Sequence, residues 1–112
     1  MGAAWLHAEG ELDVASVAEF DRTLRAAQEA VSLVAVDLQD LQFIDSSGVH
    51  ALVDASLRAM LDGRRLVITN ASPHVVRILR LTGAAPAIEL LTTVPAPDPS
   101  RPRLFLVEPL DS

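Results

Sequence analysis

Two short, almost uninterrupted aliphatic runs constrain the fold of this chain more than any other feature of its sequence. The first extends from Leu33 to Leu38, the second lies within Arg65 to Thr69, and both are too short to form a helix. Runs of this kind are typical of strands that are covered on both faces, as in the interior of a parallel sheet. We therefore expect two buried strands, with the one at Leu33 in the centre of the sheet.

The segment after Ser16 has the pattern of an amphipathic helix. Ser16 and Glu19 form a capping-box pattern, in which the hydroxyl accepts a hydrogen bond from a helix amide and the glutamate reaches back to the cap. Apolar residues recur on one face of this segment, at Val17, Phe20, Leu24 and Ala27.

Two more helices are expected, one between the aliphatic runs and one after the second run. The first follows Asp45, ends near Gly63 and has apolar residues at helical spacing, at Val49, Leu52, Val53, Leu57 and Met60. The second begins with Ser72 as its N-cap and Pro73 in its first turn, and Gly83 is expected to be the left-handed residue at its end. Its apolar positions are Val75, Val76, Leu79 and Leu81.

Shorter strand-like segments complete the pattern. In the segment Trp5 to Ala8, apolar and polar residues alternate weakly, and this predicts a short strand that leads into a turn at Gly10 to Asp13. Ala87 to Leu91 is expected to form a further short strand. Strands and helices that alternate along a chain predict the α/β class, with right-handed crossovers. We expect a mixed or mainly parallel sheet of four to five strands, flanked by helices.

Proline is concentrated near the C-terminus. Five of the seven prolines lie between Pro95 and Pro109, and the strand-like segment Arg103 to Val107 lies among them. We therefore assign residues 1–94 to one domain and residues 95–112 to a proline-rich connector with a strand-like segment that packs on the same domain. This segment is expected to pair beside Trp5 to Ala8 and to cover an open sheet edge.

Composition narrows the possible functions. The absence of cysteine excludes disulfides, thiolate metal sites and a cysteine nucleophile, and it fits a cytoplasmic protein. A net charge of −6 disfavours nonspecific binding to nucleic acid or anionic lipid. No apolar run reaches the roughly 18 residues of a membrane span. We expect protein or small-molecule partners, with no direct contact to nucleic acid or membrane.

Hydroxyl side chains occur where the first aliphatic strand gives way to a helix, in the sequence Asp45-Ser46-Ser47-Gly48. A helix start has unpaired amides and a partial positive charge, so Asp45 is suited to cap it, with Ser46 in the first turn. Ser46 should be exposed at one edge of the sheet, where a modifying enzyme could reach it. The same four residues are also a common helix entry in which they only cap the helix.

With its flanks, Val36-Asp37-Leu38 and Phe43-Ile44, this stretch resembles the signature of the STAS domain family, named for sulfate transporters and anti-sigma factor antagonists. Gly10 to Asp13 is similar to the family's Gly-x-Leu-Asp turn. Asn70 to Pro73 and Leu79 to Gly83 are similar to its later Ser-Pro helix and Leu-x-Gly ending. The resemblance covers roughly residues 5–92 and implies a STAS-like fold.

The resemblance also implies a non-catalytic regulatory protein without a cofactor, of the bacterial anti-sigma factor antagonist type. In such proteins the first serine of the motif, here Ser46, is phosphorylated by an anti-sigma factor with serine kinase activity. The unphosphorylated protein binds that partner, the phosphorylated protein releases it, and transcription is regulated indirectly. A protein phosphatase is implied as a further partner.

The residues that the resemblance assigns to partner binding are Asp13, Asp45, Ser46, Ser47, Gly48, Val49 and His50. Asp13 is expected near the serine, although an aspartate before a helix also serves as a turn or cap residue. Ser47 is expected to form a hydrogen bond at the helix start. Gly48 would let a partner backbone or a neighbouring element come close.

The sequence departs from the family pattern in three places. His50 replaces a small residue, which either alters the partner-facing surface or is simply an exposed helix residue. The family's first strand and its C-terminal helix are both missing. We expect Arg103 to Val107 to supply the missing strand.

Three other interpretations of these residues compete with the switch. A hydrolase would use Ser46, His50 and Asp45, but Asp45 adjoins the serine and is poorly placed to orient the imidazole. No metal site is expected, since His7, His50 and His74 lack the close spacing of a two-histidine site. A STAS domain that acts as a constitutive interaction module, as a partner subunit of an ABC transporter or a signalling scaffold, remains the main alternative.

Overall fold

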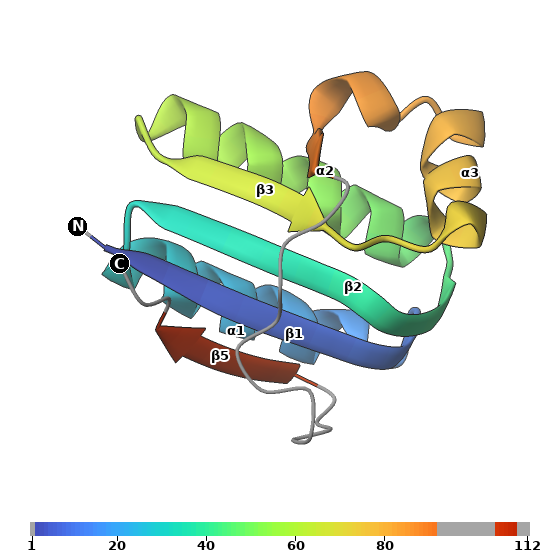
Figure 1. The fold of residues 1–112 in the computed structure, drawn as a ribbon, viewed down its shortest axis with the longest axis horizontal. Coiled ribbons are helices and arrows are strands. Elements are labelled where there is room, and N and C mark those ends of the chain that lie inside the picture. The colour runs from blue at the N-terminus through green and yellow to red at the C-terminus, as the bar shows by residue number, and fades with distance from the viewer. Residues whose placement is uncertain (1, 92–104, 110–112) are drawn as a thin grey trace.

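The computed structural model describes residues 2–91 and 105–109, and alternates strands with helices as expected (Figure 1). The elements are β1 (Ala3–Leu12), α1 (Val17–Ala30), β2 (Leu33–Ile44), α2 (Ser46–Leu61), β3 (Arg65–Thr69), α3 (Pro73–Leu81), the 3-10 helix η1 (Ala85–Ala87), β4 (Glu89–Leu91) and β5 (Phe105–Pro109). Within these residues, no helix is both long and apolar enough to span a membrane.

The strands form one sheet in the order β4-β3-β2-β1-β5, in which β1 to β4 are parallel and β5 is antiparallel to β1. The predicted α/β class and the central position of β2 are confirmed. Because β1 to β4 are adjacent in chain order, right-handed crossovers place α1, α2 and α3 on the same face of the sheet, as Figure 1 shows. The expectation that β2 is covered on both faces is confirmed for residues 34–38, because these consecutive residues point to alternate faces and all of them are buried.

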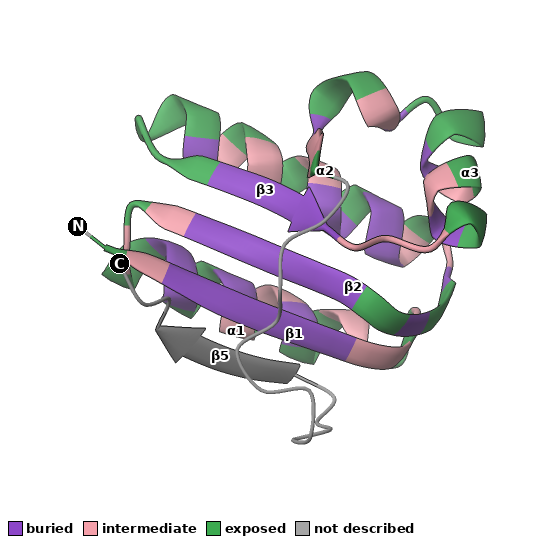
Figure 2. Cartoon of the chain, viewed as in Figure 1, coloured by how far each residue is buried: buried purple, intermediate pink, exposed green. Residues whose placement is uncertain are grey.

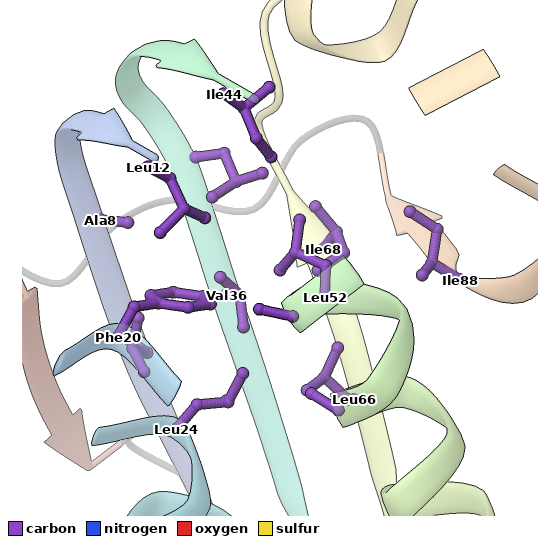
Figure 3. Packing of buried hydrophobic residues seen from close by; sticks show 14 of the residues in the cluster. Ala8, Leu12, Phe20, Leu24, Val36, Ile44, Leu52, Leu66, Ile68 and Ile88 are labelled. Carbon is purple, nitrogen blue, oxygen red and sulfur yellow. The ribbon is translucent and has the colours of Figure 1, made fainter. Parts of the chain in front are cut away.

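A single large core fills the space between the sheet and the three helices (Figure 3). Phe20 and Leu24 of α1, Leu52 of α2, and Val75 and Leu79 of α3 are fully buried in it. Figure 2 shows the corresponding pattern, in which the middle of each long strand is buried and the outer faces of the helices are exposed. The apolar faces predicted for α1 and α3 therefore pack against the sheet at these positions.

The core-facing side of α2 differs from the prediction. Leu57 and Met60 were expected on its apolar face, but they are 42% and 66% exposed. Ala51, Ala55 and Ala59 are buried instead. The alanine stripe lets α2 lie close to the sheet, and Leu57 falls on the opposite side of the helix because its spacing from Leu52 does not match the 3.6-residue period.

Strand β1 is longer than predicted. The turn expected at Gly10 to Asp13 was wrong over Gly10 to Leu12, which continue the strand beside β2. Two register shifts occur in this pairing, between His7 and Glu9 and between Gly10 and Glu11. At each shift the extra residue is on β2, and Gly10, with a φ of +79° that glycine adopts without steric cost, lets β1 continue beside it.

The capping box predicted at the start of α1 was wrong. Ser16 precedes the helix, but its side chain makes no capping hydrogen bond. Its hydroxyl donates to the backbone oxygen of Glu11 (2.8 Å) and accepts from the amide of Asp13 (3.0 Å). The hydroxyl therefore ties the helix start back to the end of β1.

Helix α3 begins and ends as predicted. The Ser72 hydroxyl accepts a hydrogen bond from the Val75 amide (3.2 Å), and Pro73 is the first helical residue. Gly83 follows the helix with a φ of +78°. Of the predicted apolar positions, Leu81 is 74% exposed, because it lies at the last turn, away from the sheet.

Two short strands form the edges of the sheet. The strand expected at Ala87 to Leu91 begins later, because η1 precedes it, and an ion pair between Arg65 and Glu89 joins β3 to β4. Hydrogen bonding to Arg65 lowers the pKa of Glu89. At the other edge, β5 pairs with β1, which confirms the pairing predicted for residues 105–107 and extends it to Pro109. Residues 103–104 and the connector at 95–102 lie outside the described residues, and the division at residue 94 stays a prediction.

Candidate functional site

Ser46 is the first residue of α2, at the carboxyl end of the central strand, and its side chain is exposed. Asp45 caps the helix as predicted. Its Oδ1 atom accepts hydrogen bonds from the amides of Ser47 (2.9 Å) and Gly48 (3.2 Å). The strand-to-helix junction thus presents the Ser46 hydroxyl outward, beside a carboxylate that is already bound to the helix amides.

The loop after β1 lies against the same junction. The Val14 amide donates to Asp45 Oδ2 (3.3 Å), and the Asp45 amide donates to the backbone oxygen of Leu12 (3.1 Å). Asp13 is therefore at the same edge as Ser46. Its own Oδ1 accepts from the amides of Ala15 (3.0 Å) and Ser16 (3.2 Å), so its carboxylate stabilises the turn that leads into α1.

Gly48 is buried where α2 crosses the ends of β1 and β2. A Cβ atom at this position would lie 2.8 Å from the backbone oxygen of Leu12, and 2.8 Å from side-chain atoms of both Leu12 and Ile44. Of the two roles expected for Gly48, the close approach of a neighbouring element is the one that this geometry requires. Glycine lets the helix start sit directly on the sheet, and this contact positions Ser46.

A cleft of about 270 Å³ opens beside Ser46, between α2 and the segment that follows α3. Its walls are mostly apolar and are formed by Ser46, Val49, His50, Val53, Thr82, Gly83, Ala84 and Ala87. His50 is exposed and Val49 is buried against the core. The Thr82 to Ala87 wall was missed in the sequence, because nothing in its composition indicates that it folds back beside a helix start that is far away in the chain.

Val14 is a second residue that the sequence did not single out. It is 76% exposed, although it is apolar, and it lies in the loop that contacts Asp45. An isolated exposed apolar residue is ordinary. Its contact with Asp45, the residue before Ser46, makes it a candidate for partner contact. The sequence indicated this residue only as an apolar side chain that follows Glu11 and Asp13.

The alternative catalytic arrangement is not assembled at this site. Both carboxylate oxygens of Asp45 accept hydrogen bonds from backbone amides, so the carboxylate does not orient the His50 imidazole. A serine nucleophile needs a base that is itself held in place. The geometry of these residues is that of a capped helix start.

Removal of the Asp45 side chain should destabilise the protein. We expect Asp45→Ala to lower the free energy of unfolding by about 1–2 kcal/mol, because three backbone amides lose their acceptor. Urea unfolding at neutral pH measures this. Asp54→Ala, on the exposed side of the same helix, is the matched control and should change stability by less than about 0.5 kcal/mol. Equal effects of the two substitutions would contradict the capping role.

Comparisons with known proteins identify the family. The model of the STAS domain matches residues 2–96, so the chain belongs to the STAS domain family. No curated protein matches the chain significantly.

Several solved structures share the fold. The unphosphorylated form of the anti-sigma factor antagonist SpoIIAA superposes with a TM-score of 0.70 at 23% identity, covering 83% of this chain and 81% of that one. The phosphorylated form of the Bacillus cell fate determinant SpoIIAA gives 0.65 at 23% identity, with 82% and 83% coverage. A candidate anti-sigma factor antagonist from Thermotoga maritima gives 0.73 at 17% identity, with 82% and 80% coverage.

Proposed function

We propose that this chain is an anti-sigma factor antagonist that acts as a non-catalytic cytoplasmic switch. In this proposal it binds an anti-sigma factor with serine kinase activity while Ser46 is unmodified, and releases it once Ser46 is phosphorylated. A protein phosphatase restores the binding state. The single observation that carries the proposal is an exposed Ser46 hydroxyl at the start of a rigidly capped helix.

The surroundings of Ser46 favour a large electrostatic effect of phosphorylation. A phosphoserine adds about −1.5 to −2 charges. A helix start often binds phosphate through its amides, but here the amides of Ser47 and Gly48 are already bound to Asp45. The phosphate would therefore lie beside the Asp45 carboxylate and project its charge toward whatever covers the site.

The surface around Ser46 suits a protein partner in its unmodified state. The neighbouring cleft is mostly apolar, and among the described residues that line it none is lysine or arginine. Val14 adds an exposed apolar side chain on the side of β1. Burial of these apolar groups would contribute favourably to the free energy of binding a partner. A phosphate on Ser46 would then place an unbalanced charge in the interface and weaken the complex.

Phosphate mapping tests the proposed switch. The purified chain is incubated with ATP and each candidate anti-sigma factor kinase from the same genome, and the modified peptide is sequenced by mass spectrometry. We expect one phosphate per chain on Ser46, lost in Ser46→Ala and retained in Ser47→Ala. A phosphate on Ser47, or none with any candidate, would contradict the switch. A tight complex without phosphorylation would instead support the constitutive interaction module.

A further inference from the structure

A histidine lies between two carboxylates on the face of the sheet that the three helices leave uncovered. His7 is only 9% exposed. Its Nδ1 atom lies 2.8 Å from Asp37 Oδ2, and its Nε2 atom lies 3.0 Å from Asp40 Oδ2. These residues lie on β1 and β2, but none of them lines the cleft at Ser46, so this cluster is separate from the site described above.

A β-bulge brings these side chains together. His7 is paired with Asp37 and Glu9 is paired with Asp40, so two steps along β1 match three steps along β2. Residues three apart in a regular strand point to opposite faces of a sheet, and the bulge turns Asp40 toward the same side as Asp37. One potential ligand atom from each of His7, Glu9 and Asp40 therefore lies within 4.8 Å of the others.

Asp37 determines which nitrogen of His7 is available. Asp37 is fully buried, and its Oδ1 atom accepts hydrogen bonds from the Gln39 amide (3.0 Å) and the Asn70 side chain (3.2 Å). Its Oδ2 atom is left to contact His7 Nδ1, and because a carboxylate accepts hydrogen bonds, we assign the ring proton to Nδ1. Nε2 then directs its lone pair toward Asp40, so that a proton or a metal cation is needed between these two atoms. A buried carboxylate that orients a histidine in this way is typical of the groups behind metal ligands.

The pairing of Glu9 with Asp40 gives a second reason for a cation. Like charges directly opposite each other on neighbouring strands destabilise a sheet, and these two carboxylates occupy paired positions. Glu9 is half-buried and Asp40 is exposed, so both can approach a cation from the solvent side of His7.

We propose that His7, Glu9 and Asp40 bind one divalent transition-metal cation, with Zn²⁺ as the best match, and that Asp37 positions the His7 ring. One nitrogen and two carboxylate oxygens are ligands of the type that Zn²⁺ accepts, and water would complete the tetrahedron. Tetrahedral bonds of about 2.0–2.2 Å place ligand atoms roughly 3.4 Å apart. His7 Nε2 and Asp40 Oδ2 are 3.0 Å apart, and all three ligand atoms lie within 4.8 Å of one another, so small side-chain adjustments would satisfy this geometry. Where Nε2 carries a proton before binding, that proton leaves to solvent as the metal–nitrogen bond forms.

This metal site was not expected from the sequence, where no metal site was predicted. That expectation rested on the spacing of His7, His50 and His74 alone. The bulge that turns Asp40 toward His7 has no signature in the sequence, so the mixed set of histidine and carboxylates was not visible there.

Calorimetric titration with ZnCl₂, using the full metal-free chain, tests the site. We expect one Zn²⁺ per chain, and Glu9→Gln and Asp40→Asn should each weaken binding by about tenfold or more. Glu9 and Asp40 are both at least partly exposed, so these two variants should fold. They therefore test the metal site even if His7→Ala fails to fold around the buried Asp37. His74→Ala is the matched control and should bind as the wild type does.

The single tryptophan provides an independent readout. Trp5 lies two residues before His7 on the same strand and the same face. Co²⁺ should quench its fluorescence in the wild type and in His74→Ala, and should do so only weakly in Asp40→Asn. Absence of stoichiometric Zn²⁺ binding, or binding that is unchanged in both carboxylate variants, would overturn the proposal in favour of a proton-bridged ion pair. Neither result bears on Ser46.

Discussion

Alanine at position 48 is expected to lower the free energy of unfolding by about 2–3 kcal/mol, the upper part of the range for overpacked sites. The added Cβ would lie 2.8 Å from the backbone oxygen of Leu12 and 2.8 Å from the side chains of Leu12 and Ile44. Leu12 also accepts the hydrogen bond from the Asp45 amide, so its backbone cannot withdraw without opening the junction. Relief of the clash must therefore move the start of α2.

Urea unfolding of Gly48→Ala and of Gly63→Ala separates this clash from the general cost of replacing a glycine. Gly63 has a φ of +67° and no atom within 4 Å of an added Cβ, so its substitution should cost only about 1 kcal/mol of backbone strain. If Gly48→Ala were no more destabilising than Gly63→Ala, the close contact between α2 and β1 would not be as described.

The second large effect is expected on partner binding. Ser46→Asp should weaken the complex with the anti-sigma factor by about a hundredfold, equivalent to about 2.8 kcal/mol. The new carboxylate would lie next to Asp45, where the Ser47 and Gly48 amides are already bound, and the partner would bury it without a counter-charge. An acidic residue in the first turn of a helix is favourable in the free protein, so the variant should fold normally.

Two control variants make this measurement specific. Ser46→Ala removes the hydroxyl without adding charge, and it should bind the partner within about threefold of the wild type. Ala26→Asp adds the same charge at an exposed position of α1 and should leave binding unchanged. Affinities from calorimetry or surface plasmon resonance compare the three variants. A similar loss for Ser46→Asp and Ala26→Asp would indicate that net charge, and not the helix start, controls the complex.

The sequence predicted the features of this fold that follow from local pattern. The aliphatic runs predicted β2 and β3, and Ser72 with Pro73 predicted the start of α3. The Asp45 cap and the exposed Ser46 were predicted because helix starts need acceptors for their free amides. The alternation of strands and helices, with right-handed crossovers, then predicted a mainly parallel sheet.

The failed predictions depend on contacts between distant segments. Ser16 was expected to cap α1, but its hydroxyl bonds to Glu11 because the end of β1 lies within reach. Leu57 was expected in the core, yet alanines of α2 face the sheet because this helix packs closely. The extension of β1 through Gly10 depends on its pairing with the bulged strand β2, so it had no local signal.

The site was predictable only in part for the same reason. Asp45 and Ser46 were visible as a motif, whereas the Thr82 to Ala87 wall of the cleft and the role of Val14 depend on tertiary packing. The sequence indicated that Gly48 allows a close approach of a neighbouring group. Only the structure shows that this group is Leu12.

The most direct test of the switch is to measure one partner's affinity for the same chain before and after Ser46 is phosphorylated. Phosphorylated chain is prepared to full occupancy with the cognate kinase, verified by mass spectrometry and titrated against the anti-sigma factor by calorimetry. We predict that the unmodified chain binds tightly and that its affinity falls by about a hundredfold or more after phosphorylation. Equal affinity of the two forms would contradict it.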